Sequence, residues 1–275
     1  MRRIGYREVF PVGLGGMPIS IDGRPDHADA IELIGRFIEL GGNFIDTAND
    51  YGVRSASGPA EEQIGRHISA RRSDYRLATK CGCGPGPGGG HIWTRENAFR
   101  GLHESLERLK TDYVDVMQLH GANPQQSEDG ELVEALEEMR RQGKVRWIGA
   151  STNLPDLPTY MEWGVFDVFQ IPYSCVQREH ENLIANAAEA GAGIIIRGGA
   201  AKGAPSESQR ARERNPELLS TWDKAGLDDL LEGATPMEFV LRFTATHPAM
   251  TTNIVGTVSP DHLAGNVTAV SKGPL

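Results

Sequence analysis

The chain has 275 residues, a composition ordinary for a soluble globular protein, and a formal net charge of −9. This acidic balance disfavours nucleic acid or an anionic membrane as a general partner, because both repel negative charge. No apolar run is long enough for a transmembrane helix, and the N-terminus lacks the apolar stretch of a secretory signal. Three cysteines are too few for a disulfide framework, so we expect a cytoplasmic protein.

Short apolar runs alternate with longer helical patterns along the whole chain. Eight runs are predicted strands, at residues 12–14, 44–46, 75–80, 114–119, 147–150, 168–171, 193–196 and 252–255. Helices are predicted at residues 26–40, 60–69, 94–109, 131–142, 154–162, 181–190, 235–245 and 260–271. Thr94 has the residue type of a helix cap, with Glu96 and Asn97 in the following turn.

This alternation predicts parallel strands joined by helical crossovers, and eight units favour a (β/α)8 TIM barrel formed by residues 1–275 as one domain. The alternative is a doubly wound sheet, whose dinucleotide-binding form carries G-x-G-x-x-G after its first strand. Here that strand reads VGLGGMP, and Pro18 stands where the third glycine would fall. The segments 81–93 and 198–218 are predicted loops at the C-terminal end of the barrel, and the charged run 206–214 is expected on a solvated loop surface.

Polar side chains fall where three consecutive predicted strands end. Asp46 ends the second strand, Lys80 the third and His120 the fourth, each after an apolar run where an unpaired charge is costly. Because neighbouring strands of a barrel end at one rim, we expect these side chains to converge. Tyr51 reaches the same rim from the loop after the second strand.

These four residues suit proton transfer. Tyrosine has an ordinary pKa of about 10, and we expect the Lys80 ammonium to lower the pKa of Tyr51 by favouring the phenolate. We expect Asp46 to pair with Lys80 in a partly buried ion pair, and His120 to bind a substrate oxygen or share in proton transfer. The cluster therefore predicts a general acid that protonates a developing alkoxide.

Zinc is another interpretation of the loop after the third strand. Cys81 and Cys83 are one residue apart and His91 follows, and these are residue types that bind zinc. No second cysteine pair lies near them, and the residues between are mostly glycine and proline. The sequence therefore predicts no metal ion.

Five segments carry a family resemblance. In chain order they are GGNFIDTANDYG, SGPAEEQIG, LATK, YVDVMQLHG and GKVRWIGAST. In this order they resemble the motifs of the aldo-keto reductase superfamily, and the resemblance spans nearly the whole sequence. It implies a (β/α)8 barrel, a nicotinamide cofactor bound without a Rossmann fold, and carbonyl reduction. It also implies that Tyr51 is the acid and base, with Asp46, Lys80 and His120 as its partners.

The resemblance also implies positions for the cofactor. Ser151 and Gln170 match residues that bind the nicotinamide carboxamide, which needs both a donor and an acceptor. Thr152 stands where many members have asparagine. Arg197 stands where many have an aromatic residue, and its planar guanidinium can stack on the ring. The alternative for Arg197 is a buried structural role, paired with an acid.

The last strand and helix resemble the segment that binds the adenosine half of the cofactor. The candidate residues are Gly256, Thr257, Ser259, His262 and Asn266. Members selective for NADPH usually place Lys or Arg here to pair with the 2′-phosphate, and this segment has neither. Family habit favours NADP(H), and NAD(H) is the alternative.

A small-molecule carbonyl compound is the expected substrate, as an aldehyde, a ketone or a sugar. Met17, Asn49 and Trp93 are predicted to line its pocket from loops at the rim. Two other functions remain open. One is a sugar or alcohol dehydrogenase working in the reverse direction, and the other is a regulatory subunit that holds a nicotinamide without significant turnover. The complete set of four proton-transfer residues favours an enzyme.

Overall fold

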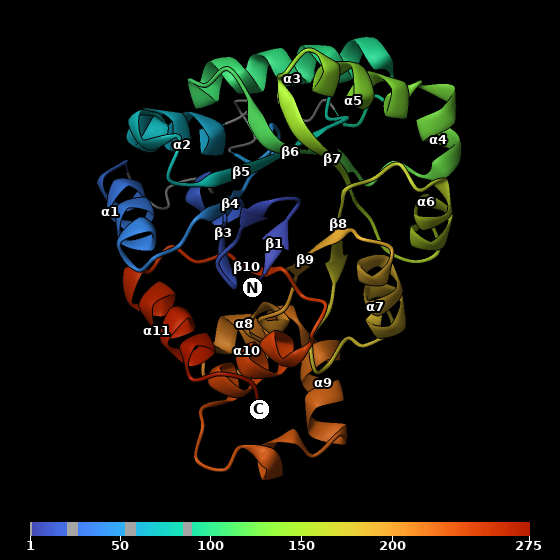
Figure 1. The fold of residues 1–275 in the computed structure, drawn as a ribbon. Coiled ribbons are helices and arrows are strands. Elements are labelled where there is room, and N and C mark those ends of the chain that lie inside the picture. The colour runs from blue at the N-terminus through green and yellow to red at the C-terminus, as the bar shows by residue number, and fades with distance from the viewer. Residues whose placement is uncertain (1, 21–26, 53–58, 85–89) are drawn as a thin grey trace.

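The computed structural model describes residues 2–20, 27–52, 59–84 and 90–275. Eight parallel strands close into a barrel in which each strand pairs with its chain neighbours and the last pairs with the first (Figure 1). They are β3 (Val12–Gly15), β4 (Phe44–Asp46), β5 (Arg76–Cys81), β6 (Val114–His120), β7 (Val145–Ser151), β8 (Val168–Pro172), β9 (Gly193–Arg197) and β10 (Thr252–Val255). The closed barrel confirms the predicted (β/α)8 fold and excludes the doubly wound alternative, whose sheet is open.

Helices surround this barrel on the outside (Figure 1). The eight predicted helices are present, with ends within three residues of the predicted ones: α1 (His27–Glu39), α2 (Pro59–Ile68), α3 (Arg95–Leu109), α5 (Leu132–Arg141), α6 (Leu157–Trp163), α7 (Glu181–Glu189), α10 (Pro236–Thr246) and α11 (Pro260–Ser271). The predicted cap is confirmed, because the Thr94 side chain accepts a hydrogen bond from the Asn97 amide. Short 3-10 helices follow β3 and α2, as η1 (Met17–Ser20) and η2 (Ser69–Arg71).

The barrel interior has an apolar layer at its N-terminal end. It contains Phe44, Ala78, Val116, Trp147, Val168 and Ile195. A hairpin that the sequence did not predict, β1 (Arg3–Ile4) and β2 (Arg7–Glu8), adds Ile4 and Val9 to this layer and closes the barrel floor. Its turn needs Gly5, because φ is +52° and an added Cβ would lie 2.5 Å from Trp147 Nε1.

The segment after β9 is where the prediction of structure was wrong. Residues 198–218 were predicted as a loop, but the structure forms η3 (Ala201–Gly203), α8 (Gln209–Arg214) and α9 (Pro216–Lys224), followed by η4 (Leu227–Leu230). The charged run therefore lies largely on a helix, which begins where the Ser208 side chain accepts a hydrogen bond from Ala211 N. Trp222 of α9 is buried and packs edge-on against Phe239. A further short helix, α4 (Pro124–Asp129), was also not predicted.

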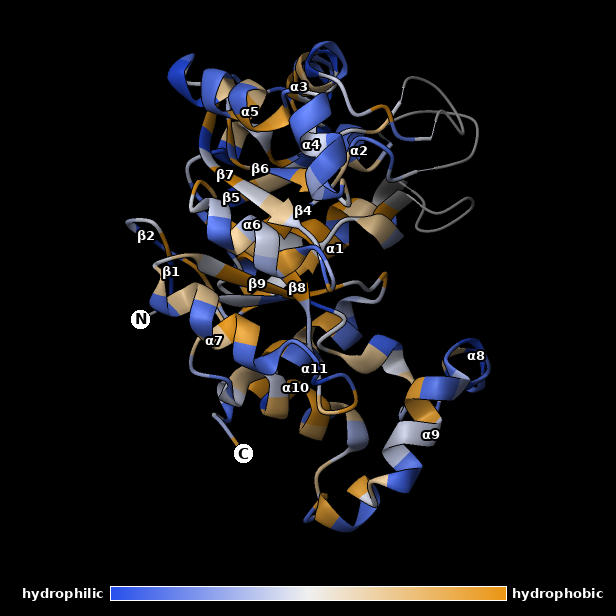
Figure 2. Cartoon of the chain, turned by 90° about the vertical axis from the view of Figure 1, so that its right-hand side faces the viewer, coloured by the Kyte–Doolittle hydropathy of each residue, from blue (hydrophilic) through white to orange (hydrophobic). Residues whose placement is uncertain are grey.

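The two ends of the barrel differ in what they carry. Figure 2 shows the β1–β2 hairpin at one end, while α8 and α9 project at the other.

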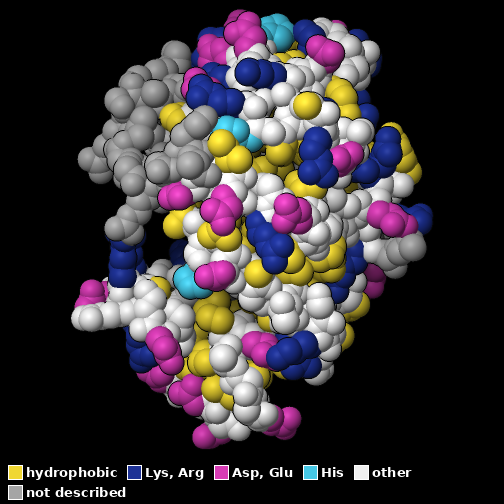
Figure 3. Space-filling model, turned by 90° about the vertical axis from the view of Figure 1, so that its left-hand side faces the viewer, with side chains coloured by type: hydrophobic (Ala, Val, Ile, Leu, Met, Phe, Trp, Pro, Cys, Tyr) yellow, Lys and Arg dark blue, Asp and Glu magenta, His cyan; other side chains and the backbone are white. Residues whose placement is uncertain are grey.

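No helix in the described part of the chain is long and apolar enough to cross a membrane. The face drawn in Figure 3 carries acidic and basic side chains interspersed.

Candidate active site

The alternation of side chains along the strands creates a polar layer above the apolar one. Because side chains two residues apart point to the same face of a strand, five of the interior apolar residues are followed by a polar residue nearer the C-terminal end. The pairs are Phe44 and Asp46, Ala78 and Lys80, Val116 and Gln118, Val168 and Gln170, and Ile195 and Arg197. The C-terminal half of the barrel interior is therefore polar and charged.

An ion pair between Lys80 and Asp46 lies at the centre of this layer. Lys80 Nζ is 2.7 Å from Asp46 Oδ2, and the side chains are 0% and 1% exposed. The predicted pair is thus present, but it is fully rather than partly buried. Lys80 also donates to the carbonyl oxygen of Thr47 at 2.8 Å.

Two amide side chains complete the partners of the carboxylate. Asp46 Oδ1 accepts from Gln118 Nε2 at 3.1 Å and from Gln170 Nε2 at 2.8 Å. A buried carboxylate with an ammonium and two amide donors keeps its charge at a lower cost than an unpaired one. Side chains from β5, β6 and β8 therefore hold the Asp46 carboxylate in place.

Tyr51 lies directly above this pair. Lys80 Nζ is 4.7 Å from the centroid of the Tyr51 ring. Burial raises the pKa of Tyr51, and the Lys80 ammonium only partly offsets this rise. Lys80 acts in the expected direction, but the net pKa of Tyr51 is raised because loss of hydration outweighs the attraction of the ammonium. Tyr51 therefore keeps its proton at neutral pH.

Lys80 also keeps its proton. Burial alone would lower the pKa of Lys80, but the charges of Asp46 and Tyr51 act against burial, and the net pKa is raised. The lysine therefore remains an ammonium beneath Tyr51. Should Tyr51 lose its proton, this cation would stabilise the phenolate that forms.

His120 faces Tyr51 across the rim. The two rings meet edge to face with centroids 6.0 Å apart. Burial lowers the pKa of His120 to about 3, and the positive charge of Lys80 adds to this effect. At neutral pH the imidazole is uncharged, so one ring nitrogen donates a hydrogen bond and the other accepts. The structure thus brings together all four residues that were predicted to converge.

The residues predicted to bind the nicotinamide lie on the next strands around the rim. Ser151 donates its hydroxyl hydrogen to Gln170 Oε1 at 2.9 Å, so the two side chains form one unit connected to Asp46. Thr152 is buried beside them. Arg197 is close enough for the charges of Tyr51 and Asp46 to affect it, and its buried Nε has no hydrogen-bond partner among the described residues. The structural alternative for Arg197 required a paired acid, and no described acid forms an ion pair with it.

The residues predicted to bind adenosine lie away from this cluster, at the end of β10 and the start of α11. Ser259 is the N-cap of α11, and its side chain accepts a hydrogen bond from His262 N. Thr257 Oγ1 accepts from Ser259 N at 3.1 Å, and Gly256 follows β10 beside Pro18. The exposed side chain of His262 lies in the first turn of the helix, and Asn266 lies one turn further.

The three predicted substrate residues have different surroundings. Met17 is 55% exposed at the start of η1. Trp93 stacks on His91 with ring centroids 4.9 Å apart, and His91 in turn meets the ring of His120 edge to face. Asn49 is buried, and its amide nitrogen lies toward Gly101 of the surrounding helix α3.

Sequence reasoning missed some residues of the site. Gln118 was not predicted, although its position two residues before His120 places it on the same face of β6. Asp50, Cys83 and His91 were not connected with His120, yet Cys83 Sγ lies 3.4 Å and Asp50 Oδ1 lies 3.7 Å from His120 Nδ1. Their proximity depends on the path of two loops, which no local sequence pattern specifies.

The protein is thus a (β/α)8 barrel with a cluster of buried titratable residues at the C-terminal ends of its strands, where the enzymes of this fold have their active sites. Residues 11–275 match the aldo/keto reductase family. The chain therefore belongs to the aldo/keto reductase family and is an oxidoreductase.

Named relatives agree with this membership. An oxidoreductase of Bacillus subtilis strain 168, YqkF, is 28% identical over 100% of this chain and 92% of its own length. The L-galactose dehydrogenase of Arabidopsis thaliana is 29% identical over 96% of this chain and 85% of its own. Among solved structures, the holo form of aldo-keto reductase AKR11C1 from Bacillus halodurans superimposes with a TM-score of 0.85 at 27% identity, covering 100% of this chain and 91% of that one.

Proposed function

We propose that residues 1–275 act as one NAD(P)(H)-dependent reductase domain, which converts an aldehyde or ketone of a small organic molecule or sugar to the alcohol. The observation that carries this proposal is the buried Lys80–Asp46 pair beneath a protonated Tyr51. A buried charge is costly even when it is paired, and buried titratable groups with shifted pKa values cluster at functional sites. Reduction of a carbonyl requires such a proton donor.

The residues present fit a nicotinamide cofactor. Ser151 and Gln170 offer a hydroxyl and an amide side by side, as a carboxamide requires, and the buried Arg197 Nε has no other partner among the described residues. The first turn of α11, capped by Ser259, provides backbone N–H groups that suit a phosphate. When bound, a reduced nicotinamide supplies hydride to the carbonyl carbon.

The protein supplies the proton and the orientation. Tyr51 donates its hydroxyl proton to the carbonyl oxygen, which becomes the alcohol. The Lys80 ammonium stabilises the resulting phenolate, and Asp46 keeps Lys80 in place. Neutral His120 donates a hydrogen bond to the same oxygen and so fixes which side of the carbonyl faces Tyr51.

NADP(H) is the cofactor we propose, with NAD(H) as the alternative. NADP(H) is the cofactor that members of the family commonly use. NAD(H) is the alternative because the segment from Ser259 to Asn266 contains no Lys or Arg to pair with a 2′-phosphate. A cytoplasmic location is part of the same proposal, and it is supported by all three cysteines being free.

Fluorescence titration with NADPH and NADH tests the proposal, using wild type, Tyr51→Phe and the control Tyr6→Phe. Tyr6 is 68% exposed on the hairpin at the opposite end of the barrel. We expect all three proteins to bind the cofactor, and only wild type and Tyr6→Phe to reduce 4-nitrobenzaldehyde. Failure of wild type to bind either nucleotide would refute cofactor dependence. Undiminished turnover in Tyr51→Phe would refute the assigned acid.

A second candidate is oxidation of a sugar or alcohol by the same residues in reverse. It is favoured by the similarity to a relative named L-galactose dehydrogenase. Tighter binding of NAD+ than of NADPH, together with oxidation of a sugar in the absence of any carbonyl compound, would select this direction.

A further inference from the structure

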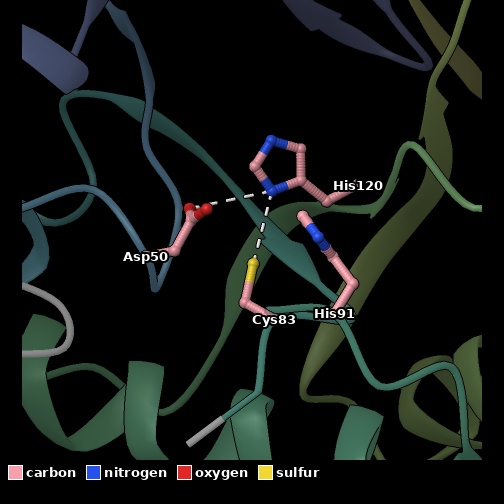
Figure 4. Close-up of side chains that lie close together, drawn as sticks. All are labelled: Asp50, Cys83, His91 and His120. Carbon is pink, nitrogen blue, oxygen red and sulfur yellow. Dashed lines mark hydrogen bonds and ion pairs between the residues drawn. The ribbon is translucent and has the colours of Figure 1, made fainter. Parts of the chain in front are cut away.

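Four potential metal ligands meet at the rim of the barrel. They are Asp50 in the loop after β4, Cys83 and His91 in the loop after β5, and His120 at the end of β6, and their ligand atoms all lie within 4.8 Å of one another. Figure 4 shows Asp50 and Cys83 directed at His120 Nδ1, with the His91 ring beside them. Of these residues, only His120 was assigned a role in the proposed reductase chemistry.

The separations suit a tetrahedral ion. Zinc bonds of about 2.0–2.3 Å at tetrahedral angles place neighbouring ligand atoms about 3.3–3.7 Å apart. Cys83 Sγ lies 3.4 Å from His120 Nδ1, and Asp50 Oδ1 lies 3.7 Å from the same nitrogen. The remaining separations, at most 4.8 Å, need side-chain shifts of about 1 Å to match that range.

The backbone fixes the two ligands of the β5 loop opposite one another. Cys83 and His91 form an antiparallel bridge, with Ile92 N donating to Gly82 O at 2.8 Å. Asn97 of α3 donates to the carbonyl oxygens of both Cys83 and Ile92, which attaches each side of this bridge to the helix. The two ligands are therefore positioned before any ion binds, which lowers the entropy cost of binding.

The chemistry of the four groups selects the kind of ion. A thiolate and two imidazoles favour zinc and similar borderline-soft cations over magnesium or calcium, which prefer oxygen ligands only. One thiolate and one carboxylate also balance a divalent charge, so the occupied site would carry no net charge beside Lys80. Without an ion, Cys83 and His120 form a hydrogen bond between Sγ and Nδ1.

We propose that Asp50, Cys83, His91 and His120 form a binding site for a single divalent cation of the zinc class. On binding, the Cys83 sulfur forms a bond to the metal and its S–H bond breaks, releasing one proton to solvent with no change of oxidation state. His120 binds through Nδ1, and Nε2 points away from the other ligands (Figure 4).

The sequence argued against a metal because Cys81 and Cys83 lacked a second cysteine pair. The fold removes Cys81 from consideration, since its sulfur is buried and directed at the carbonyl oxygen of Gln118. It supplies Asp50 and His120 in its place. This inference goes beyond the reductase proposal and does not depend on it, because metal binding requires neither nicotinamide nor substrate.

Cobalt(II) titration of the full chain, after removal of metals with a chelator, tests the site by absorption spectroscopy. We expect one equivalent to give tetrahedral visible bands and a sulfur-to-cobalt charge-transfer band in the near ultraviolet, both lost when zinc displaces cobalt. Cys83→Ala should abolish the charge-transfer band, whereas the control Cys175→Ala should retain it. Absence of that band in wild type, or its persistence in Cys83→Ala, would overturn the proposal.

Two exposed ligands provide variants that leave the core intact. His91 and Asp50 are exposed, so His91→Ala and Asp50→Asn should fold as wild type does, which circular dichroism checks. Each should weaken cobalt binding by at least about tenfold, as loss of a group needed at a metal site does. An adventitious ion only, bound weakly in several equivalents and unchanged by both substitutions, would count against a built site.

Discussion

Removal of either charge from the Lys80–Asp46 pair is expected to destabilise the fold strongly. Lys80→Met leaves the Asp46 carboxylate 1% exposed, with only the two amide donors of Gln118 and Gln170. Asp46→Asn leaves the Lys80 ammonium 0% exposed, with one carbonyl oxygen and a neutral amide. Breaking a buried pair costs about 3–5 kcal/mol, so we expect each single variant to lose that much free energy of unfolding.

The double variant distinguishes pairing from simple burial. With both charges removed, no uncompensated charge remains, so the total loss should be smaller than either single loss, and far below their sum. Urea unfolding of the four proteins, followed by circular dichroism, measures the difference. The exposed pair Arg71–Asp74, with N···O at 2.9 Å, is the matched control and should show no measurable coupling. Single costs that add to within about 0.5 kcal/mol would refute the reasoning.

Three further predictions concern other parts of the fold. Glu61→Ala should lower the free energy of unfolding by about 3–5 kcal/mol, because it breaks a buried ion pair between α2 and α3, while the exposed neighbour variant Glu62→Ala should change little in the same urea assay. Burial raises the pKa of Tyr75 to about 12, so the folded state holds this proton longer than the unfolded state. Stability should therefore fall as pH rises from about 10 toward 12, and thermal melts of Tyr75→Phe should show a smaller fall. Gly5→Ala should lower the melting temperature, because its Cβ would meet Trp147 at a positive φ; an unchanged melting temperature would show that the hairpin adjusts freely.

The barrel could be predicted from the sequence because strands buried on both faces are short apolar runs, and these runs alternate regularly with helices. Asp46, Lys80 and His120 were found because each is a charged or titratable residue at the end of such a run. Gln118 was missed because a neutral amide within VDVMQLHG carries no comparable signal, although the period of two assigns it to the same face as His120.

Other features depend on long-range structure. The sequence of helix α8, QRARER, has no apolar periodicity because the helix buries no residue. Ser208, a residue type that caps helices, was the local sign that a helix begins there. The net rise of the Tyr51 pKa was not predicted, because the sequence reveals the neighbouring ammonium but not the depth of burial. The proximity of Asp50 and Cys83 to His120 follows from three separate segments, which only the closed barrel brings together.

Barrel closure joins the first barrel strand to the last. β3 pairs with β10, with Val12 opposite Asn253, and the Arg2 guanidinium donates to carbonyl oxygens of Ala245 and Met250. During synthesis on the ribosome, an intermediate in which β3 to β9 have paired but residues 252–255 are missing therefore has a parallel sheet with two unpaired edges, which can pair with other chains. The final strand to leave the ribosome is the one that removes both edges, so premature termination before β10 should yield an aggregating fragment rather than a smaller barrel.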